Sequence, residues 1–293
     1  MKYALSRFVC LLLLCASAAL YAQPRPAKPA MPKGYPAKLT FEKEPFRQFA
    51  RRFEVFKKKY GFNYLNQVLD SVGCTIGQLT YAATPIKLPV AQFISNQDTA
   101  AAVLLALRQF IDDNQDLFHT TSKEIALLSM SEQEGVYDVM FERAVYGKYR
   151  SAGKTRGMLE FVIDKQGAIA VLVCTATRRL TNLPNDETYP LDKIYKNLIG
   201  KKLEFAVDEK QVRYVIDRID VIKPAKVCVY EKKTFDDIRD KNGDIVERRL
   251  RVSEVRLAYD VEIDIKYTKP IARIFIDAIT GEEIALEYPF LEN

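Results

Sequence analysis

The sequence contains a single histidine, His119, and this scarcity excludes a large class of metal sites. A zinc motif that uses two histidines on one helix has too few ligands here. A serine nucleophile activated by His119 would lack its usual turn, because no Gly-x-Ser-x-Gly segment is present. A cysteine nucleophile paired with His119 stays open as an alternative. His119 follows an apolar pair, Leu117 and Phe118, at the end of an expected helix, which favours a surface or capping role.

Other catalytic signatures are missing as well. The sequence has no phosphate-binding glycine loop, and no pair of carboxylates stands out among 38 dispersed acidic residues. The segment Asp240–Asp244 resembles a calcium loop only at its centre. Aligning Gly243 with the loop glycine puts Ile238 and Arg249 at the first and twelfth ligand positions, and both residue types are wrong. We therefore expect a binding protein rather than an enzyme, with no catalytic residue, metal ligand or cofactor.

The sequence has fewer cysteines than a protein stabilised mainly by disulfides would have. Two of the five cysteines precede residue 23, which leaves Cys74, Cys174 and Cys228. An exported domain that depends on disulfides usually carries more of them, in even number. Cys174 and Cys228 lie in apolar, strand-like runs, so we expect buried thiols. One bridge plus one remaining thiol is the alternative.

The first 22 residues have the layout of a secretory signal peptide. Lys2 and Arg7 precede an apolar run from residue 8 to 20, which is too short for a hydrocarbon core of about 30 Å. Small residues follow, and cleavage is expected after Ala22. A lipid anchor on Cys15 is the alternative, although Leu14 is larger than a lipoprotein signal prefers. No later window approaches 18 apolar residues, so we expect a secreted or periplasmic protein without a transmembrane segment.

The remaining chain is long and apolar enough for two folded domains. Without Lys2 and Arg7 it has 42 basic and 38 acidic residues, a net charge of +4, which does not require a polyanionic partner. Hydrophobic residues make up 48% of the sequence and aromatic residues 11%, which argues against global disorder. Residues 23–40 include five prolines and are expected to form an extended spacer.

Residues 41–73 form an expected N-terminal helical segment. Its aromatic residues follow in steps of 3, 4, 3 and 4, which predicts one buried stripe along a helix from Pro45 to Tyr60. The stripe consists of Phe46, Phe49, Phe53, Phe56 and Tyr60. The opposite face is basic. We expect it to be a solvated face, with docking of a partner as the alternative and no nucleic-acid binding.

Residues 74–182 are expected to form a first α+β domain. A capping box at Ser95–Asp98 predicts a helix that begins near Ser95 and buries Val103, Leu107, Phe110 and Ile111. Alternating strands follow, in which the inward residues are Tyr137, Val139 and Phe141, and then Leu159, Phe161 and Ile163. Asp164 and Gly167 form a turn before the apolar run 168–174.

Residues 188–290 are expected to form a second domain of the same kind. Its helix buries Leu191, Ile194, Tyr195, Leu198 and Ile199, and ends at Gly200. Asn242-Gly243 predicts a two-residue type I′ hairpin. The clearest strand runs over residues 256–265, with Leu257, Tyr259, Val261, Ile263 and Ile265 on one face. Asp277 and Gly281 form a turn equivalent to that at Asp164 and Gly167.

Both domains repeat one pattern, in which a Tyr-Asp-Val strand is followed by a strand that ends in Ile-Asp and then by a glycine turn. The predicted fold class is therefore α+β, with two units that each pack a helix on an antiparallel sheet, after an N-terminal amphipathic helix.

These segments resemble a known family arrangement over roughly residues 75–288. Gln78-Leu79, the helix 101–114, the strand 137–147 and the segment 158–171 are similar to the fungalysin/thermolysin propeptide domain. Val227-Cys-Val-Tyr230, Arg256–Val261 and the ending Phe275-Ile-Asp-Ala-Ile-Thr-Gly-Glu282 are similar to the PepSY domain that follows it in such precursors. The resemblance implies a cystatin-like sheet and helix in each unit.

Such propeptides act as intramolecular chaperones and inhibitors of the zinc peptidase that follows them. No peptidase domain follows here, so the resemblance implies an inhibitor or folding helper that acts in trans on a secreted thermolysin-like metalloprotease. An extracellular or envelope binding module without a protease partner is the alternative. The candidate partner-binding residues form the C-terminal tail and are Tyr288, Phe290, Leu291, Glu292 and Asn293. Its aromatic and leucine side chains suit an apolar pocket, and its carboxylates suit a zinc ion.

Overall fold

A computed structural model describes residues 32–93, 98–154, 156–180, 183–207, 210–264 and 270–289. The expected signal peptide, Cys15 and residues 23–31 of the proline-rich spacer lie outside these residues. Within the described ranges, no helix combines the length and apolar character needed to cross a bilayer.

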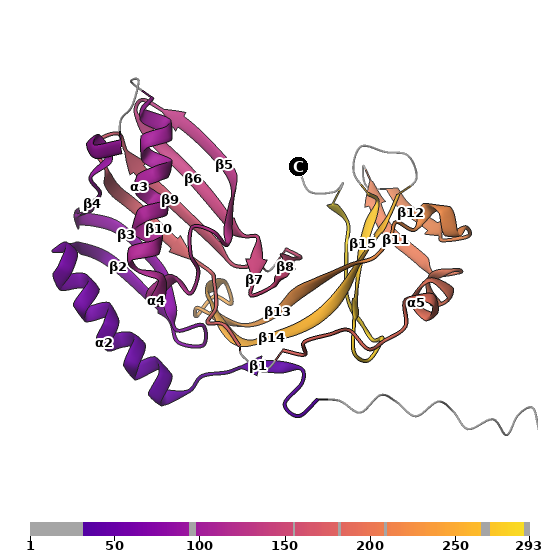
Figure 1. The fold of residues 1–293 in the computed structure, drawn as a ribbon. Coiled ribbons are helices and arrows are strands. Elements are labelled where there is room, and N and C mark those ends of the chain that lie inside the picture. The colour runs from indigo at the N-terminus through magenta and orange to yellow at the C-terminus, as the bar shows by residue number, and fades with distance from the viewer. Residues whose placement is uncertain are drawn as a thin grey trace, which may run out of the picture. The chain divides into compact units, whose positions relative to one another are not determined.

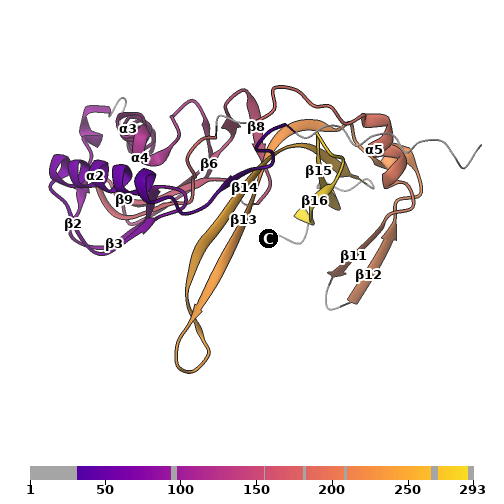
Figure 2. The ribbon, with the colours of Figure 1, turned by 90° about the horizontal axis from the view of Figure 1, so that it is seen from below.

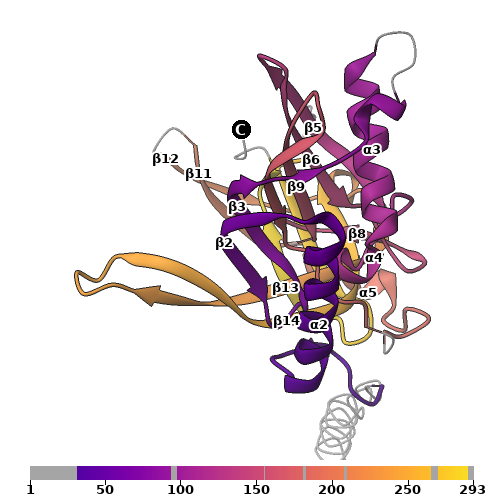
Figure 3. The ribbon, with the colours of Figure 1, turned by 90° about the vertical axis from the view of Figure 1, so that its left-hand side faces the viewer.

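The N-terminal amphipathic helix is α2 (Lys43–Tyr60), and it follows a short strand, β1 (Ala37–Leu39). Phe49, Phe53 and Phe56 are buried, as the spacing predicts. The helix ends at Gly61, whose φ of +60° suits a residue without a side chain. Figure 3 shows α2 beside strands β2 and β3.

The first sheet is antiparallel and contains seven strands. In order across the sheet, these are β2 (Asn63–Asp70), β3 (Thr75–Thr84), β10 (Ala168–Cys174), β9 (Met158–Asp164), β6 (Val136–Arg143) and β5 (Ile125–Gln133). The seventh strand, β4 (Ile86–Lys87), pairs with β10 outside this order. A 3-10 turn (Val90–Phe93), α3 (Thr99–Asp113) and α4 (Gln115–Phe118) accompany it. Together with α2, these helices cover one side of the sheet (Figure 1).

The start of α3 differs from the predicted one. The helix begins at Thr99, and Asp98 is its N-cap, with a side chain that accepts a hydrogen bond from Ala101 N at 2.9 Å. The sequence pattern instead placed Asp98 inside the first turn and the cap at Ser95, which lies outside the described residues. A cap at Asp98 satisfies one of the free amides of the first turn by itself.

The first core consists of the helices' apolar stripes and the inward residues of the sheet. Val103, Leu107 and Phe110 of α3 pack with Phe118 of α4 and with Phe161 of β9. The inward faces predicted for β6 and β9 are confirmed, because Tyr137, Val139, Phe141, Leu159, Phe161 and Ile163 are all buried.

The second sheet also contains seven strands. In order, these are β16 (Glu283–Glu287), β15 (Ala272–Asp277), β14 (Ile245–Ile263), β13 (Lys226–Arg239), β8 (Tyr149–Ala152) and β7 (Val145–Tyr146). The seventh strand, β1, pairs with β14 outside this order. Helix α5 (Leu191–Leu198) packs on it, and a 3-10 turn (Ile219–Val221) and a separate hairpin of β11 (Lys202–Val207) and β12 (Lys210–Val215) complete this half.

The second core joins α5 to the strand predicted to be central. Leu257, Tyr259, Val261 and Ile263 of β14 are buried with Ile194 and Leu198, as expected. Leu191 and Ile199 were also predicted to belong to the buried stripe, but this is wrong: their side chains are 39% and 41% exposed. The helix stops at Leu198, so Ile199 leaves the helical period and turns outward.

Strand β8 links the two halves of the chain. It pairs in parallel with β13, through Arg150, Ser151 and Ala152 opposite Cys228, Val229 and Tyr230. Residues 145–152, which the sequence analysis assigns to the first domain, therefore form part of the second sheet.

The turn between β13 and β14 is longer than predicted. The last cross-strand pair is Arg239–Ile245, so five residues form the loop instead of two. Oδ1 of Asp240 accepts hydrogen bonds from the amides of Asn242 and Asp244, and Gly243 has a φ of +90°. The hairpin position is right, but its type I′ assignment is wrong, because the Asp240 side chain organises a wider turn.

The α+β class predicted from the sequence is confirmed. Both large sheets are mainly antiparallel, helices cover one side of each, and β8–β13 is a parallel pair within this pattern.

Candidate partner-binding surface

The first sheet leaves one face uncovered by its helices. Successive strand residues point to opposite faces, so the residues between the buried ones lie on the side away from α2 and α3. Met140, Glu160, Val173, Gln78 and Val68 are cross-strand neighbours and form one row across five strands. Figure 2 shows the helices on one side of this sheet. We call the opposite side the open face.

The open face carries more apolar side chains than a purely solvated sheet needs. A second row places Asp138 beside Val162, and Val162 beside Val171. Val68 is 43% exposed, and Val162, Val171 and Val173 are partly exposed. β-Branched residues mixed with a few acidic residues form a surface on which a protein partner can bury apolar area and pair charges.

The hairpin of β13 and β14 extends beyond the second sheet. Strands β1, β8 and β15 pair with its residues up to Tyr230 and from Ser253 onward. Residues 234–252, which we call the arm, pair with each other. Phe235 and Val246 on the arm are 47% and 62% exposed. Figure 2 shows the arm pointing away from the helices.

A cavity of about 230 Å³ lies where the arm meets the first sheet. Val68 and Gln78 line it from the sheet, and the cross-strand neighbours Phe235 and Leu250 line it from the arm. Lys233 and Arg248 add positive charge, and Asp70 adds a carboxyl group whose pKa is raised by burial. The open face and the arm therefore meet at an amphipathic hollow.

Buried polar contacts fix the base of the arm to the first sheet. Oε1 of Glu231 accepts hydrogen bonds of 2.6 Å from the hydroxyls of Thr177 and Ser253. Nζ of Lys233 donates a 2.6 Å hydrogen bond to the carbonyl of Thr175 and lies 3.7 Å from Glu231. Hydrogen bonds to charged groups contribute about 1.5–3 kcal/mol each, so this junction is a strong one.

The predicted C-terminal tail is placed only in part. The ring of Tyr288 packs on Phe205 with centroids 5.3 Å apart, and burial raises its pKa. Phe290, Leu291, Glu292 and Asn293 lie outside the described residues. Tyr288 therefore contacts the β11–β12 hairpin rather than standing free.

The two predicted turn pairs lie at the ends of strands. Oδ1 of Asp164 accepts from the amides of Gln166 and Ala168, and Gly167 has a φ of +89°. Oδ1 of Asp277 accepts from the amides of Ile279 and Thr280, and Gly281 has a φ of +74°. A side chain at Gly281 would lie 2.2 Å from the ring of Tyr189. Both turns stabilise the fold, and neither lines the hollow between the open face and the arm.

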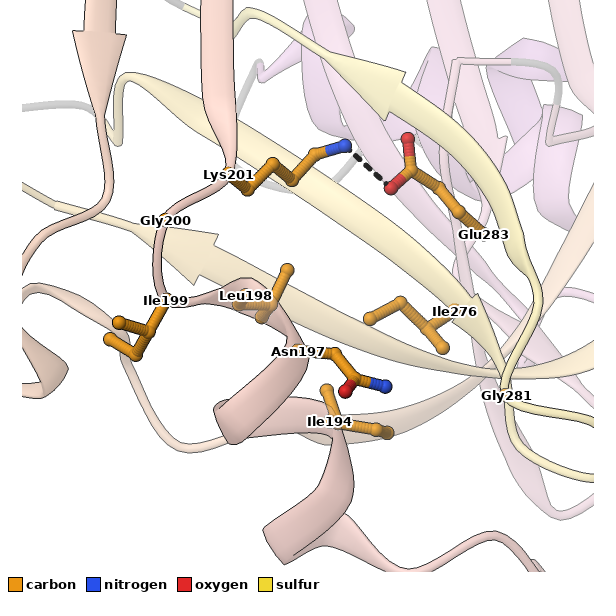
Figure 4. A pocket seen from close by; sticks show the side chains of 9 residues that line it. All are labelled: Ile194, Asn197, Leu198, Ile199, Gly200, Lys201, Ile276, Gly281 and Glu283. Carbon is orange, nitrogen blue, oxygen red and sulfur yellow. Dashed lines mark ion pairs between the residues drawn. The ribbon is translucent and has the colours of Figure 1, made fainter. Parts of the chain in front are cut away.

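A second hollow, of about 450 Å³, lies between the end of α5 and strand β15 (Figure 4). Ile194, Leu198 and Ile276 form its apolar wall. Lys201 and Glu283 meet across it in an ion pair of 2.8 Å. Ile194, Leu198 and Ile276 are buried, whereas Val68 and Phe235 are exposed, so we assign the main surface to the open face and the arm.

His119 has a structural environment. It is the αL residue that ends α4, with a φ of +51°, and its Nε2 lies 2.7 Å from the carbonyl oxygen of Cys74. Burial lowers its pKa to about 4. In the described part of the chain, Cys74, Cys174 and Cys228 are free thiols, and no group of three histidine, cysteine or acidic residues is placed to hold a metal ion.

Sequence reasoning missed the open face and the arm. On β10, Val171 and Val173 are apolar although they face away from the core, so alternation does not reveal an exposed side. The available signal for a long hairpin was that strand-like segments as far apart as Val227 and Ile263 flank the single predicted turn at Asn242-Gly243.

Comparisons with known proteins leave the family open. No protein-family model matches this chain, and no curated protein does. Among solved structures, the Bacillus megaterium YpeB C-terminal domain aligns with 85% of this chain and 98% of its own length, at 12% identity and a TM-score of 0.29. A likeness of this size supports no conclusion about fold or function.

Proposed function

We propose that the chain is an exported, non-catalytic binding protein that captures a polypeptide partner on the open face and the arm. The observation that carries this proposal is the amphipathic hollow at their junction, where Val68 and Phe235 are exposed beside Lys233 and Asp70. Protein interfaces use apolar anchors surrounded by polar groups, and the open face and the arm offer this composition.

The proposed partner is a secreted thermolysin-like metalloprotease, which the chain inhibits or helps to fold. This step rests on the resemblance of residues 75–288 to a propeptide domain followed by a PepSY domain, and above all on the ending at Phe275–Glu282. A propeptide-like inhibitor must cover a large surface of its enzyme, and an uncovered sheet with a projecting hairpin provides one.

The test is binding and inhibition of thermolysin-like peptidases by the chain starting at Gln23. A Val68→Ser/Phe235→Ser variant removes both apolar anchors of the hollow, and we expect it to weaken binding at least tenfold, because central anchors carry most interface energy. Leu105→Ser is the matched control, since Leu105 is equally exposed but lies on α3, away from the open face.

Different outcomes would remove the proposed binding surface and the proposed peptidase partner. Equal binding by the hollow variant and the control would remove the open face as the site. Absence of any inhibition, with capture of a different exported polypeptide that depends on Val68 and Phe235, would remove the peptidase and leave a binding module of another specificity.

A further inference from the structure

Positive charge is concentrated at the N-terminal side of the chain. Residues 23–60 contain 11 basic and 3 acidic residues, a net charge of +8. Residues 61–293 contain 31 basic and 35 acidic residues, a net charge of −4. The modest overall charge therefore hides two regions of opposite sign, and such asymmetry is typical of proteins that bind polyanionic surfaces.

Helix α2 holds most of this positive charge on the side away from the core. Phe49, Phe53 and Phe56 occupy its inner face, and Val55, with a side chain that is 66% exposed, lies on its outer face. The helix has seven basic residues against two acidic ones, Glu44 and Glu54; the basic residues are Lys43, Arg47, Arg51, Arg52, Lys57, Lys58 and Lys59. At 1.5 Å per residue, these charges extend over about 27 Å.

These cations are mostly uncompensated, unlike many elsewhere in the chain. Arg256 and Arg273 pair with buried Asp277 and Asp260. Among the described residues, Arg47 is the one cation of α2 that approaches a carboxylate, at 4.0 Å from Glu44. Arg51, Arg52 and Lys58 form no ion pair with any carboxylate in the part of the chain that the structure describes, so α2 presents open positive charge.

Helix stability explains only part of this pattern. Lys57, Lys58 and Lys59 lie in the last turn, where cations interact favourably with the helix dipole. Lys43, Arg47 and Arg51 instead follow one another at intervals of four, where like charges repel and weaken a helix. The helix dipole therefore does not account for these three charges.

We propose that the outer face of α2 docks on the anionic lipid headgroups of a membrane surface. A protein partner would need apolar anchors or a groove, and Val55 is the only large apolar side chain on this face. Single-stranded nucleic acid would need aromatic platforms, and Phe49, Phe53 and Phe56 are buried. A bilayer surface needs only a row of positive charge, and the expected signal peptide brings the chain to a membrane.

The attachment is peripheral and reversible. The apolar side of α2 is committed to the core, so the helix cannot insert among acyl chains. Attraction by anionic headgroups decays within a Debye length, which is about 8 Å at physiological ionic strength. This inference depends on export but not on a peptidase partner.

The test is co-sedimentation of the chain starting at Gln23 with vesicles of phosphatidylcholine alone or with roughly one third phosphatidylglycerol. We expect binding to the anionic vesicles only, and loss of binding in 0.5 M salt, because screening is then nearly complete. Substituting glutamine for Arg47, Arg51, Arg52 and Lys58 should weaken binding at least tenfold.

A matched control removes four exposed lysines from other elements, namely Lys87, Lys123, Lys193 and Lys241, and changes the net charge by the same amount. It should bind within about threefold of the parent chain. The α2 variant should unfold no earlier than the parent, since like-charge repulsion is relieved. Equal binding by both variants, equal binding to neutral vesicles, or binding to DNA without vesicle binding would overturn the proposal.

Discussion

The hydroxyl of Tyr35 donates a hydrogen bond of 3.0 Å to Oδ2 of Asp277, a residue 242 positions later in the chain. The same carboxylate oxygen accepts a 2.9 Å hydrogen bond from Arg256. Burial and the neighbouring Asp277 raise the pKa of Tyr35, so the phenol stays protonated and remains a donor. The segment before β1 is therefore attached to the turn of the last hairpin.

Replacement of Tyr35 by Phe should lower the free energy of unfolding by about 1–2 kcal/mol, because one hydrogen bond to a charged, buried acceptor is lost. Urea denaturation measures the change. Tyr81→Phe is the control and should have no measurable effect, since Tyr81 is exposed. Equal stability of Tyr35→Phe and the parent chain would show that Arg256 and the turn amides satisfy Asp277 without the phenol.

Stability should fall as the pH is lowered from 6.5 toward 4, and His119 should contribute to this fall. Its pKa is about 4 in the folded chain and near 6.5 in the unfolded chain, so the unfolded state binds the extra proton in this window. The contribution is on the order of 1–3 kcal/mol.

A His119→Asn variant should lose less stability over the same window, because asparagine does not titrate and tolerates the left-handed backbone of this position. Thermal unfolding at several pH values measures both slopes. Parallel slopes for the two proteins would contradict the assignment.

Val261→Asp should destabilise the second core by several kcal/mol, because Val261 is fully buried opposite Ile274 and an unpaired carboxylate would have no partner there. Val246→Asp introduces the same group on the exposed part of the arm and should change stability by less than about 0.5 kcal/mol. A Val261→Asp protein as stable as Val246→Asp would refute the core assignment of β14.

The thiols of Cys74, Cys174 and Cys228 should react slowly with a thiol reagent in the folded chain starting at Gln23 and rapidly in denaturant. All three are buried, and burial raises the pKa of Cys228 to about 12. The melting temperature should be the same with and without reductant. A lower melting temperature in reductant would show that a disulfide contributes.

Features with local causes were predictable from the sequence. The aromatic spacing of α2 allows one buried face and no other, and the strict alternation in Leu257–Ile263 identifies the inner side of β14. Strand β8 was not predicted, because its partner strand begins 74 residues later and its four residues carry no periodic signal. The open face was missed for a related reason, since Val171 and Val173 are apolar without being core.

The sequence predicted Tyr288 as a site residue, whereas the structure places the hollow on other elements. Tyr288 packs against Phe205, whereas the hollow formed by Val68 and Phe235 combines β2 and β13, which are 163 positions apart at their starts. Such a hollow depends on how two sheets meet, and this is a property of tertiary packing rather than of any local pattern.

The parallel pairing of β8 with β13 also joins two strands that are synthesised at different times. Ala152 leaves the ribosome 78 residues before its partner Tyr230. At 5–20 residues per second, this delay is roughly 4–16 s. During that time β7 and β8 have no β13 edge to join, while the last strands of the first sheet, β9 and β10, are completed by residue 174. The edge of β8 that pairs with β13 therefore stays unsatisfied for seconds while the chain is synthesised.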